Sequence, residues 1–268
     1  MELQTKVNIP VSDWKIAPCE QMLFVGSCFA DNLGRRFQTE KFRATVNPRG
    51  VMYNPASILH TVELCRDEVP HVAVFTLGTN HVYRLRETGE IVDNCQKRPQ
   101  TLFKKEELSV GECASLLVQA VEELQRRYPA LKVVVTVSPI RYAKYGFHGS
   151  ALSKATLLLA ADKLVKQIPD TVTYFPAYEL LNDELRDYRF YREDMLHPSD
   201  QAVEYIYRRF AETFFSPVTF EFLDEWKPIR EALAHKPFHP ESSEYQVFLG
   251  KTQERLAALR RKYPMMGE

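Results

Sequence analysis

The 268-residue sequence has no excess of charge of either sign, because 35 basic residues balance 35 acidic ones. A nucleic-acid-binding protein usually carries a basic excess or stripe. No apolar stretch is long enough to span a bilayer, and the N-terminal MELQTKVNIPVSDWK lacks the apolar core of a signal peptide. We therefore expect no nucleic-acid partner, no membrane partner and a cytoplasmic location.

Cysteine is also scarce, and no two cysteines lie close together in the sequence. The five cysteines are Cys19, Cys28, Cys65, Cys95 and Cys113. An odd number of scattered cysteines fits neither a disulfide framework nor a zinc site of the Cys-x-x-Cys type. The sequence also has no His-Glu-x-x-His pattern. We expect no metal and no other cofactor.

What is present is a regular alternation of apolar runs and helical periodicity. The expected strands are the apolar segments 22–26, 42–48, 71–79, 131–139 and 171–181. Segments with helical spacing separate them, one opening on Asn54 and Pro55 and another on the capping-box pair Ser109 and Glu112. Strands that are apolar throughout favour a parallel sheet covered on both faces. The sequence predicts a flavodoxin-like three-layer α/β/α sandwich around about five parallel strands.

Two stretches depart from this alternation. Residues 81–94 resemble an excursion with a turn near Gly89. From Val218 onward there is no convincing strand, only two helical segments with a break at Pro237 and Pro240. We expect residues 1–217 to form the α/β domain and residues 218–268 to form a helical extension packed on it.

The corner after the first strand carries two candidate nucleophiles, Ser27 and Cys28. In open parallel sheets, ligands bind where the strands end, which is where this corner is expected to lie. Ser27 caps the next helix or attacks a substrate. Cys28 is expected to point about a third of a turn away from Ser27, toward the core, where free cysteines are commonly found. A cysteine nucleophile is therefore the minor alternative.

The remaining parts of a hydrolytic site follow the other strands. His197 can take the proton of a serine, and Asp194, three residues earlier, can orient the imidazole. The backbone of Ser27, the backbone of Gly50 and the side chain of Asn80 are candidate donors to an oxyanion. His81 and His148 are expected to contact substrate or to be structural. A metal site made of His81, His148, Asp194 and His197 is a weaker alternative.

Four blocks in order give the sequence a resemblance to a known family: GSCFADNL, LGTNHVY, SPIRYAKYGFHGSALSKATL and DELRDYRFYREDMLHPS. They resemble the GSCFA family, which is similar to the SGNH (GDSL-type) hydrolases, over about Asn8 to Phe215. The resemblance implies Ser27 as nucleophile, His197 as base and Asp194 as its partner. It also implies Gly50 and Asn80 as oxyanion donors. Val25-Gly26-Ser27-Cys28 replaces the usual Gly-Asp-Ser-Leu, and Gly78-Thr79-Asn80-His81 replaces the usual Gly-x-Asn-Asp.

The resemblance and the residues together predict a serine esterase or deacylase that hydrolyses a small acyl ester through an acyl-serine. By family analogy its substrate is a small molecule or an acetylated carbohydrate. His81, His148 and Arg189 are the expected substrate contacts. The alternatives are a carbohydrate O-acyltransferase using the same site and an inactive glycan-binding module. The sequence makes no prediction of oligomeric state.

Overall fold

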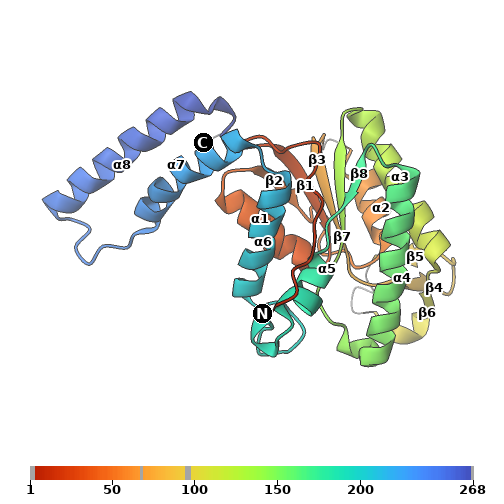
Figure 1. Cartoon of the computed structure of the whole chain (residues 1–268). Coiled ribbons are helices and arrows are strands. Elements are labelled where there is room, and N and C mark those ends of the chain that lie inside the picture. The colour runs from red at the N-terminus through yellow and green to blue at the C-terminus, as the bar shows by residue number, and fades with distance from the viewer. Residues whose placement is uncertain (1–3, 67–68, 94–97, 267–268) are drawn as a thin grey trace.

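The computed structural model describes residues 4–66, 69–93 and 98–266. Its centre is a five-stranded parallel sheet in the order β2-β1-β3-β7-β8 (Figure 1). The strands are β1 (Gln21–Gly26), β2 (Arg43–Val46), β3 (Val72–Leu77), β7 (Lys132–Val137) and β8 (Val172–Tyr174). The predicted three-layer sandwich with a parallel sheet of about five strands is confirmed.

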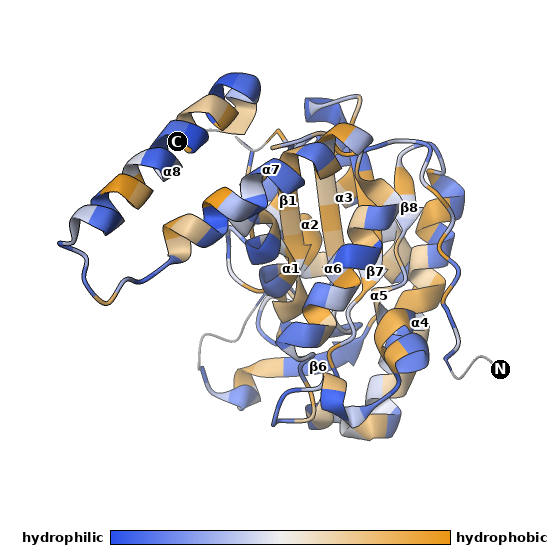
Figure 2. Ribbon diagram, turned by 60° about the vertical axis from the view of Figure 1, so that its left-hand side comes forward, coloured by the Kyte–Doolittle hydropathy of each residue, from blue (hydrophilic) through white to orange (hydrophobic). Residues whose placement is uncertain are grey.

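Helices cover both faces of this sheet, as Figures 1 and 2 show. One layer consists of α2 (Pro55–Leu64), α3 (Val110–Arg127) and α4 (Gly146–Gln167); the other contains α1 (Cys28–Thr39), the short α5 (Ala177–Glu179) and α6 (Asp200–Phe214). Successive residues of β1 point to opposite faces. Leu23 and Val25 join the apolar core of the first layer, whereas Met22 and Phe24 join that of the second. β1 is therefore apolar on both sides.

Local capping chemistry sets where the helices begin. Asn54 Oδ1 accepts a hydrogen bond from the backbone N–H of Ser57 at 3.0 Å, and Ser109 and Glu112 form the predicted capping box. These side chains satisfy backbone N–H groups that have no partner within the helix.

A second, three-stranded antiparallel sheet follows β3. It consists of β4 (His81–Leu85), β5 (Ile91–Val92) and β6 (Phe103–Glu107) in the order β5-β4-β6. The turn predicted near Gly89 joins β4 to β5. The strand β6 was not predicted, because its sequence FKKEE has one apolar residue and its pairing partner β4 lies about twenty residues earlier.

The C-terminal part contains α7 (Pro217–Ala234) and α8 (Ser243–Lys262). Figure 1 shows α8 lying beside α7 and extending away from the sheet. Their own small core consists of Cys19, Phe222, Trp226, Ile229, Leu256, Leu259 and Met266. None of the described helices is both long and apolar enough to cross a membrane.

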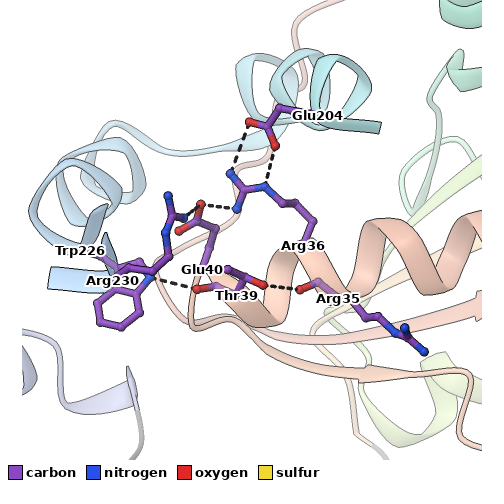
Figure 3. A network of polar contacts seen from close by, with 7 residues as sticks. All are labelled: Arg35, Arg36, Thr39, Glu40, Glu204, Trp226 and Arg230. Carbon is purple, nitrogen blue, oxygen red and sulfur yellow. Dashed lines mark hydrogen bonds and ion pairs between the residues drawn. The ribbon is translucent and has the colours of Figure 1, made fainter. Parts of the chain in front are cut away.

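A polar network joins α7 to the end of α1, as Figure 3 shows. The indole Nε1–H of Trp226 donates to the carbonyl oxygen of Thr39 at 3.0 Å. The buried carboxylate of Glu40 accepts hydrogen bonds from Arg36 and Arg230. A buried carboxylate needs such paired donors, so these contacts fix the position of α7 against α1.

Candidate active site

The site is built around the corner at which β1 passes into α1. Gly26 ends β1 with a φ of +148°, and a Cβ atom at this position would lie 2.2 Å from the carbonyl oxygen of Thr76 in β3. That same carbonyl accepts the backbone N–H of Ser27 at 3.1 Å. The corner is thus held tightly against the neighbouring strand, which only a glycine at position 26 permits.

Ser27 is fully buried in this corner. Its Oγ accepts a hydrogen bond from the backbone N–H of Phe29 at 3.2 Å and lies 3.1 Å from Oγ1 of Thr76. The side chain therefore caps α1 and ties it to β3.

Cys28, the first residue of α1, has a different environment. Its side chain is half-buried and lines a cavity, with Sγ 4.0 Å from the hydroxyl oxygen of Tyr53. The expectation that Cys28 points toward the core is met only in part, because Cys28 packs against the apolar core of the second layer and also lines the cavity. Because Ser27 turns toward β3, the next residue of the helix turns out toward the edge where the strands end. Burial raises the pKa of the Cys28 thiol.

The structure brings Asp194 and His197 together. The imidazole Nδ1 of His197 lies 2.6 Å from Oδ2 of Asp194. The other carboxylate oxygen accepts the backbone N–H groups of Leu196 and His197 at 2.8 and 2.9 Å. These two backbone donors, with the imidazole, lower the pKa of Asp194 to about 2. The carboxylate is therefore ionised at neutral pH, and His197 donates from Nδ1, which leaves Nε2 as its second nitrogen.

The turn that carries this pair is anchored at several points. Met195 has a φ of +56°, a left-handed conformation unusual for this residue type. The backbone N–H of Arg192 donates to the carbonyl oxygen of His197 at 2.8 Å, and that of Arg141 donates to Leu196 at 3.0 Å. The turn is thus fastened to the loop that follows β7.

The cavity has a volume of about 460 Å³, which suits a small ligand. Its walls come from the start of α1, the segment before α2, the small antiparallel sheet, the loop after β7 and the His197 turn. The residues are Cys28, Tyr53, Asn54, Thr79, His81, Tyr83, Val92, Asp93, Gln100, Ile140, Arg141, Tyr142, Ala143, Lys144, Tyr145, Leu196 and His197. Cys28, His197 and the predicted substrate contact His81 therefore share one cavity.

His81 is an unusual member of this wall, because its side chain is only 4% exposed. Its Nδ1 lies 3.5 Å from Oε1 of Glu107, but neither ring nitrogen has a hydrogen-bond partner among the described residues. The ring packs on Tyr145 with centroids 3.8 Å apart. Burial lowers the pKa of His81, so a neutral imidazole faces the cavity.

The three predicted oxyanion donors already donate hydrogen bonds within the protein. The backbone N–H of Gly50 donates to Asn47 at 2.8 Å, and Gly50 is exposed. The amide Nδ2 of Asn80 donates to the carbonyl oxygen of Leu108 at 2.8 Å. The N–H of Ser27 is used by Thr76, and none of the three residues lines the cavity. Asn54, which sequence reasoning identified only as a helix cap, does line it.

The other predicted contacts lie outside the cavity. His148 is exposed at the start of α4, and Arg189 is exposed and paired with Asp187 at 3.0 Å. No cluster of His, Cys, Asp and Glu among the described residues is arranged to hold a metal ion. The proposed metal grouping of His81, His148, Asp194 and His197 is therefore not assembled.

Sequence reasoning missed a buried lysine next to the site. Lys154 of α4 is 3% exposed, and its Nζ donates to the carbonyl oxygens of Gly78 and Ser138 at 2.7 Å each. Burial lowers its pKa from 10.5 to about 7. A neutral amine has two hydrogens, one for each carbonyl. Lys154 thus joins the ends of β3 and β7 beneath the cavity.

Lys154→Met is expected to destabilise the protein by about 2 kcal/mol or more, because two buried carbonyls lose their donor. Between pH 7 and pH 10 the unfolded chain binds more protons at this lysine than the folded one, so wild-type stability rises with pH across this range. In Lys154→Met the free energy of unfolding should lack the part of this increase with pH that comes from the lysine. Urea unfolding at several pH values measures both effects, with exposed Lys163→Met of the same helix as control. Identical pH slopes in the wild type and Lys154→Met would contradict the assignment.

Fold and site together define a class: a three-layer α/β/α protein with a His–Asp pair and a cavity where its parallel strands end. More narrowly, the chain belongs to the GSCFA family, whose model matches residues 21–71 and 68–210. A model described as the C-terminal domain of GSCFA domain proteins matches residues 226–266. No curated protein matches the chain.

Solved structures are similar to this one at low sequence identity. A variant of Axe2, an acetyl-xylooligosaccharide esterase from Geobacillus, has 13% identity and a TM-score of 0.50, covering 76% of this chain and 98% of its own. A catalytic mutant of the acetylxylan esterase Axe2 from Geobacillus stearothermophilus has 12% identity, a TM-score of 0.50 and coverages of 75% and 97%. A carbohydrate esterase family 3 enzyme from Talaromyces cellulolyticus has 11% identity, a TM-score of 0.42 and coverages of 76% and 99%. The two Axe2 similarities show the fold alone.

Proposed function

We propose that the protein is an ester hydrolase that removes a small acyl group, such as acetyl, from a carbohydrate hydroxyl. One observation carries the proposal: His197, which is hydrogen-bonded to Asp194, lines the same cavity as Cys28, the first residue of α1. A base, its orienting carboxylate and a nucleophile-bearing corner are the parts that acyl transfer needs.

In this mechanism His197 is the general base and acid. Its Nε2 takes the proton of a nucleophile from the β1–α1 corner as that group attacks the ester carbonyl. The same nitrogen then protonates the leaving alcohol and activates water in the second half of the reaction. Asp194, whose pKa is lowered to about 2, stays ionised and stabilises the imidazolium formed in each half.

The developing oxyanion requires donors that are not already used. The backbone N–H of Cys28 lies in the first turn of α1, where amides have no partner within the helix and the dipole favours negative charge. Asn54 lines the cavity, and its Oδ1 is occupied by Ser57, so its Nδ2 is the group that can donate to a ligand. We propose these two groups as the oxyanion donors.

The cavity walls support a sugar ester as substrate. Tyr53, Tyr83, Tyr142 and Tyr145 line the cavity, and aromatic faces stack against the apolar faces of sugar rings. Lys144 donates to the hydroxyl of Tyr83 at 2.5 Å and adds a cation to the same wall. The acetyl-xylooligosaccharide esterase activity of a structural neighbour makes acetylated oligosaccharides the first substrates to test.

The test is a panel of esters assayed with purified protein. Aryl acetate, butyrate and octanoate esters report acyl length, and acetylated xylo-oligosaccharides report the alcohol, with released acetate measured directly. We expect turnover of acetyl esters that falls with acyl length. Transfer to an added sugar hydroxyl in preference to water would identify the O-acyltransferase alternative. Absence of turnover with every ester and acceptor would contradict the proposal.

A further inference from the structure

We infer that Cys28, and not Ser27, is the nucleophile of this site, so that the reaction passes through a thioester on Cys28. This inference rests on the proposed function and specifies its covalent step. It reverses the preference that the sequence alone gives to Ser27.

Every polar group of Ser27 has a structural partner. Its N–H donates to Thr76, its carbonyl oxygen accepts the N–H of Ala30 at 2.8 Å, and its Oγ is engaged by Phe29 and Thr76. The side chain is fully buried and does not line the cavity. For Ser27 to attack a substrate, the helix cap and the contact with β3 would both have to break.

Cys28 meets the requirements that Ser27 does not. It is half-buried, lines the cavity, and shares that cavity with His197. Its weak contact with the hydroxyl of Tyr53, at 4.0 Å, leaves the sulfur accessible to a ligand. Its backbone N–H lies at the start of α1, where a developing oxyanion is favoured.

A second observation points to a ligand in the same cavity. His81 is almost fully buried on its wall, and neither of its ring nitrogens has a hydrogen-bond partner among the described residues. A buried polar nitrogen without a hydrogen-bond partner destabilises the free protein. A polar ligand bound next to Cys28 would supply the missing partner.

The chemistry balances with the groups present. The thiol proton of Cys28 passes to Nε2 of His197 as Sγ bonds to the ester carbonyl carbon. The tetrahedral intermediate collapses, the carbon–oxygen bond to the alcohol breaks, and His197 returns the proton to the alcohol. Water then attacks the thioester with His197 as base. The carbon–sulfur bond breaks, the carboxylic acid leaves and the thiol of Cys28 is restored.

The discriminating experiment has two parts, the first of which does not depend on turnover. Iodoacetamide alkylation, followed by peptide mass spectrometry, is compared for wild type and His197→Ala. We expect Cys28 to be modified faster than buried Cys19 and Cys113, and its rate to fall about tenfold or more without His197. An equal rate in His197→Ala would overturn the pairing of Cys28 with His197.

The second part compares Cys28→Ala and Ser27→Ala on the best ester of the panel. Cys28→Ala should lose hydrolysis by about 10³-fold or more and form no acetyl-enzyme in quenched samples. Ser27→Ala should stay within about tenfold of wild type and unfold at a lower urea concentration, because it loses the cap of α1. In wild type, hydroxylamine should release an acetyl group found on the Cys28 peptide.

The outcomes separate the inference from the proposed function. Turnover retained in Cys28→Ala and lost in Ser27→Ala would overturn the inference and leave the esterase function standing. A wild type that hydrolyses no ester, yet shows His197-dependent alkylation of Cys28, would overturn the function and support Cys28 as the reactive group.

Discussion

An alanine in place of His197 is expected to lower kcat/KM for ester hydrolysis by about 10³-fold, within the range that general acid–base catalysis contributes. Its ring lines the cavity and contacts Asp194 through Nδ1, whereas His81, the other histidine that lines this cavity, has no hydrogen-bonded carboxylate among the described residues. Steady-state kinetics measure the loss. Partial recovery of activity with added imidazole would separate a missing base from a damaged fold.

The chain provides a matched control for this variant. His71 also has its Nδ1 2.6 Å from a carboxylate oxygen, that of Glu20, but it lies just before β3, at the opposite end of the sheet. His71→Ala removes the same type of pair and should leave kcat/KM within about twofold of wild type. Equal losses in the two variants would mean that the His197 effect is structural.

Asp194 has two roles: its negative charge acts on His197, and its two backbone hydrogen bonds hold the turn. A substitution that removes only the charge tests the first role. Asp194→Asn keeps an oxygen for Leu196 and His197 and removes the negative charge that stabilises an imidazolium. We expect a loss of about 10²-fold or more in kcat with a smaller change in KM. The pKa of the carboxyl is lowered to about 2, so loss of activity between pH 7 and pH 4 belongs to a group other than Asp194.

The sequence was informative where the structure depends on local pattern. Apolar runs and caps determined the five strands and their order of succession along the chain. The spacing of Asp194 and His197 indicated their contact, because a single turn can bring together two side chains that are three residues apart. Such features need no knowledge of distant parts of the chain.

The rest of the site depends on contacts between distant segments. Ser27 is turned inward by Thr76, which lies 49 residues later, and Asn80 is committed to the carbonyl of Leu108, 28 residues later. Lys154 reaches Gly78 across 76 residues. No periodicity within a single segment encodes these pairings. This is why the sequence identified polar residues after each strand but could not separate those that line the cavity, such as His81 and His197, from those that do not, such as Asn80.

The largest loss of stability is expected from one methyl group at Gly26. The Cβ of Gly26→Ala would lie 2.2 Å from the carbonyl oxygen of Thr76 and 2.5 Å from its Oγ1. The carbonyl belongs to β3, which is paired on both sides, so it cannot move without disturbing the ladder with β7. We expect a loss of about 3 kcal/mol or more, measured by urea unfolding, and in the extreme no folded protein.

Gly89→Ala is the control, since Gly89 also has a positive φ, +74°, but a Cβ there meets nothing within 4 Å. It should cost only the backbone penalty, about 1 kcal/mol. The difference between the two variants therefore measures the closeness of β1 to β3. That closeness is what turns Ser27 inward and places Cys28 on the cavity wall. A Gly26→Ala protein as stable as Gly89→Ala would mean that the corner relaxes easily. Ser27 could then turn toward the cavity and act as the nucleophile.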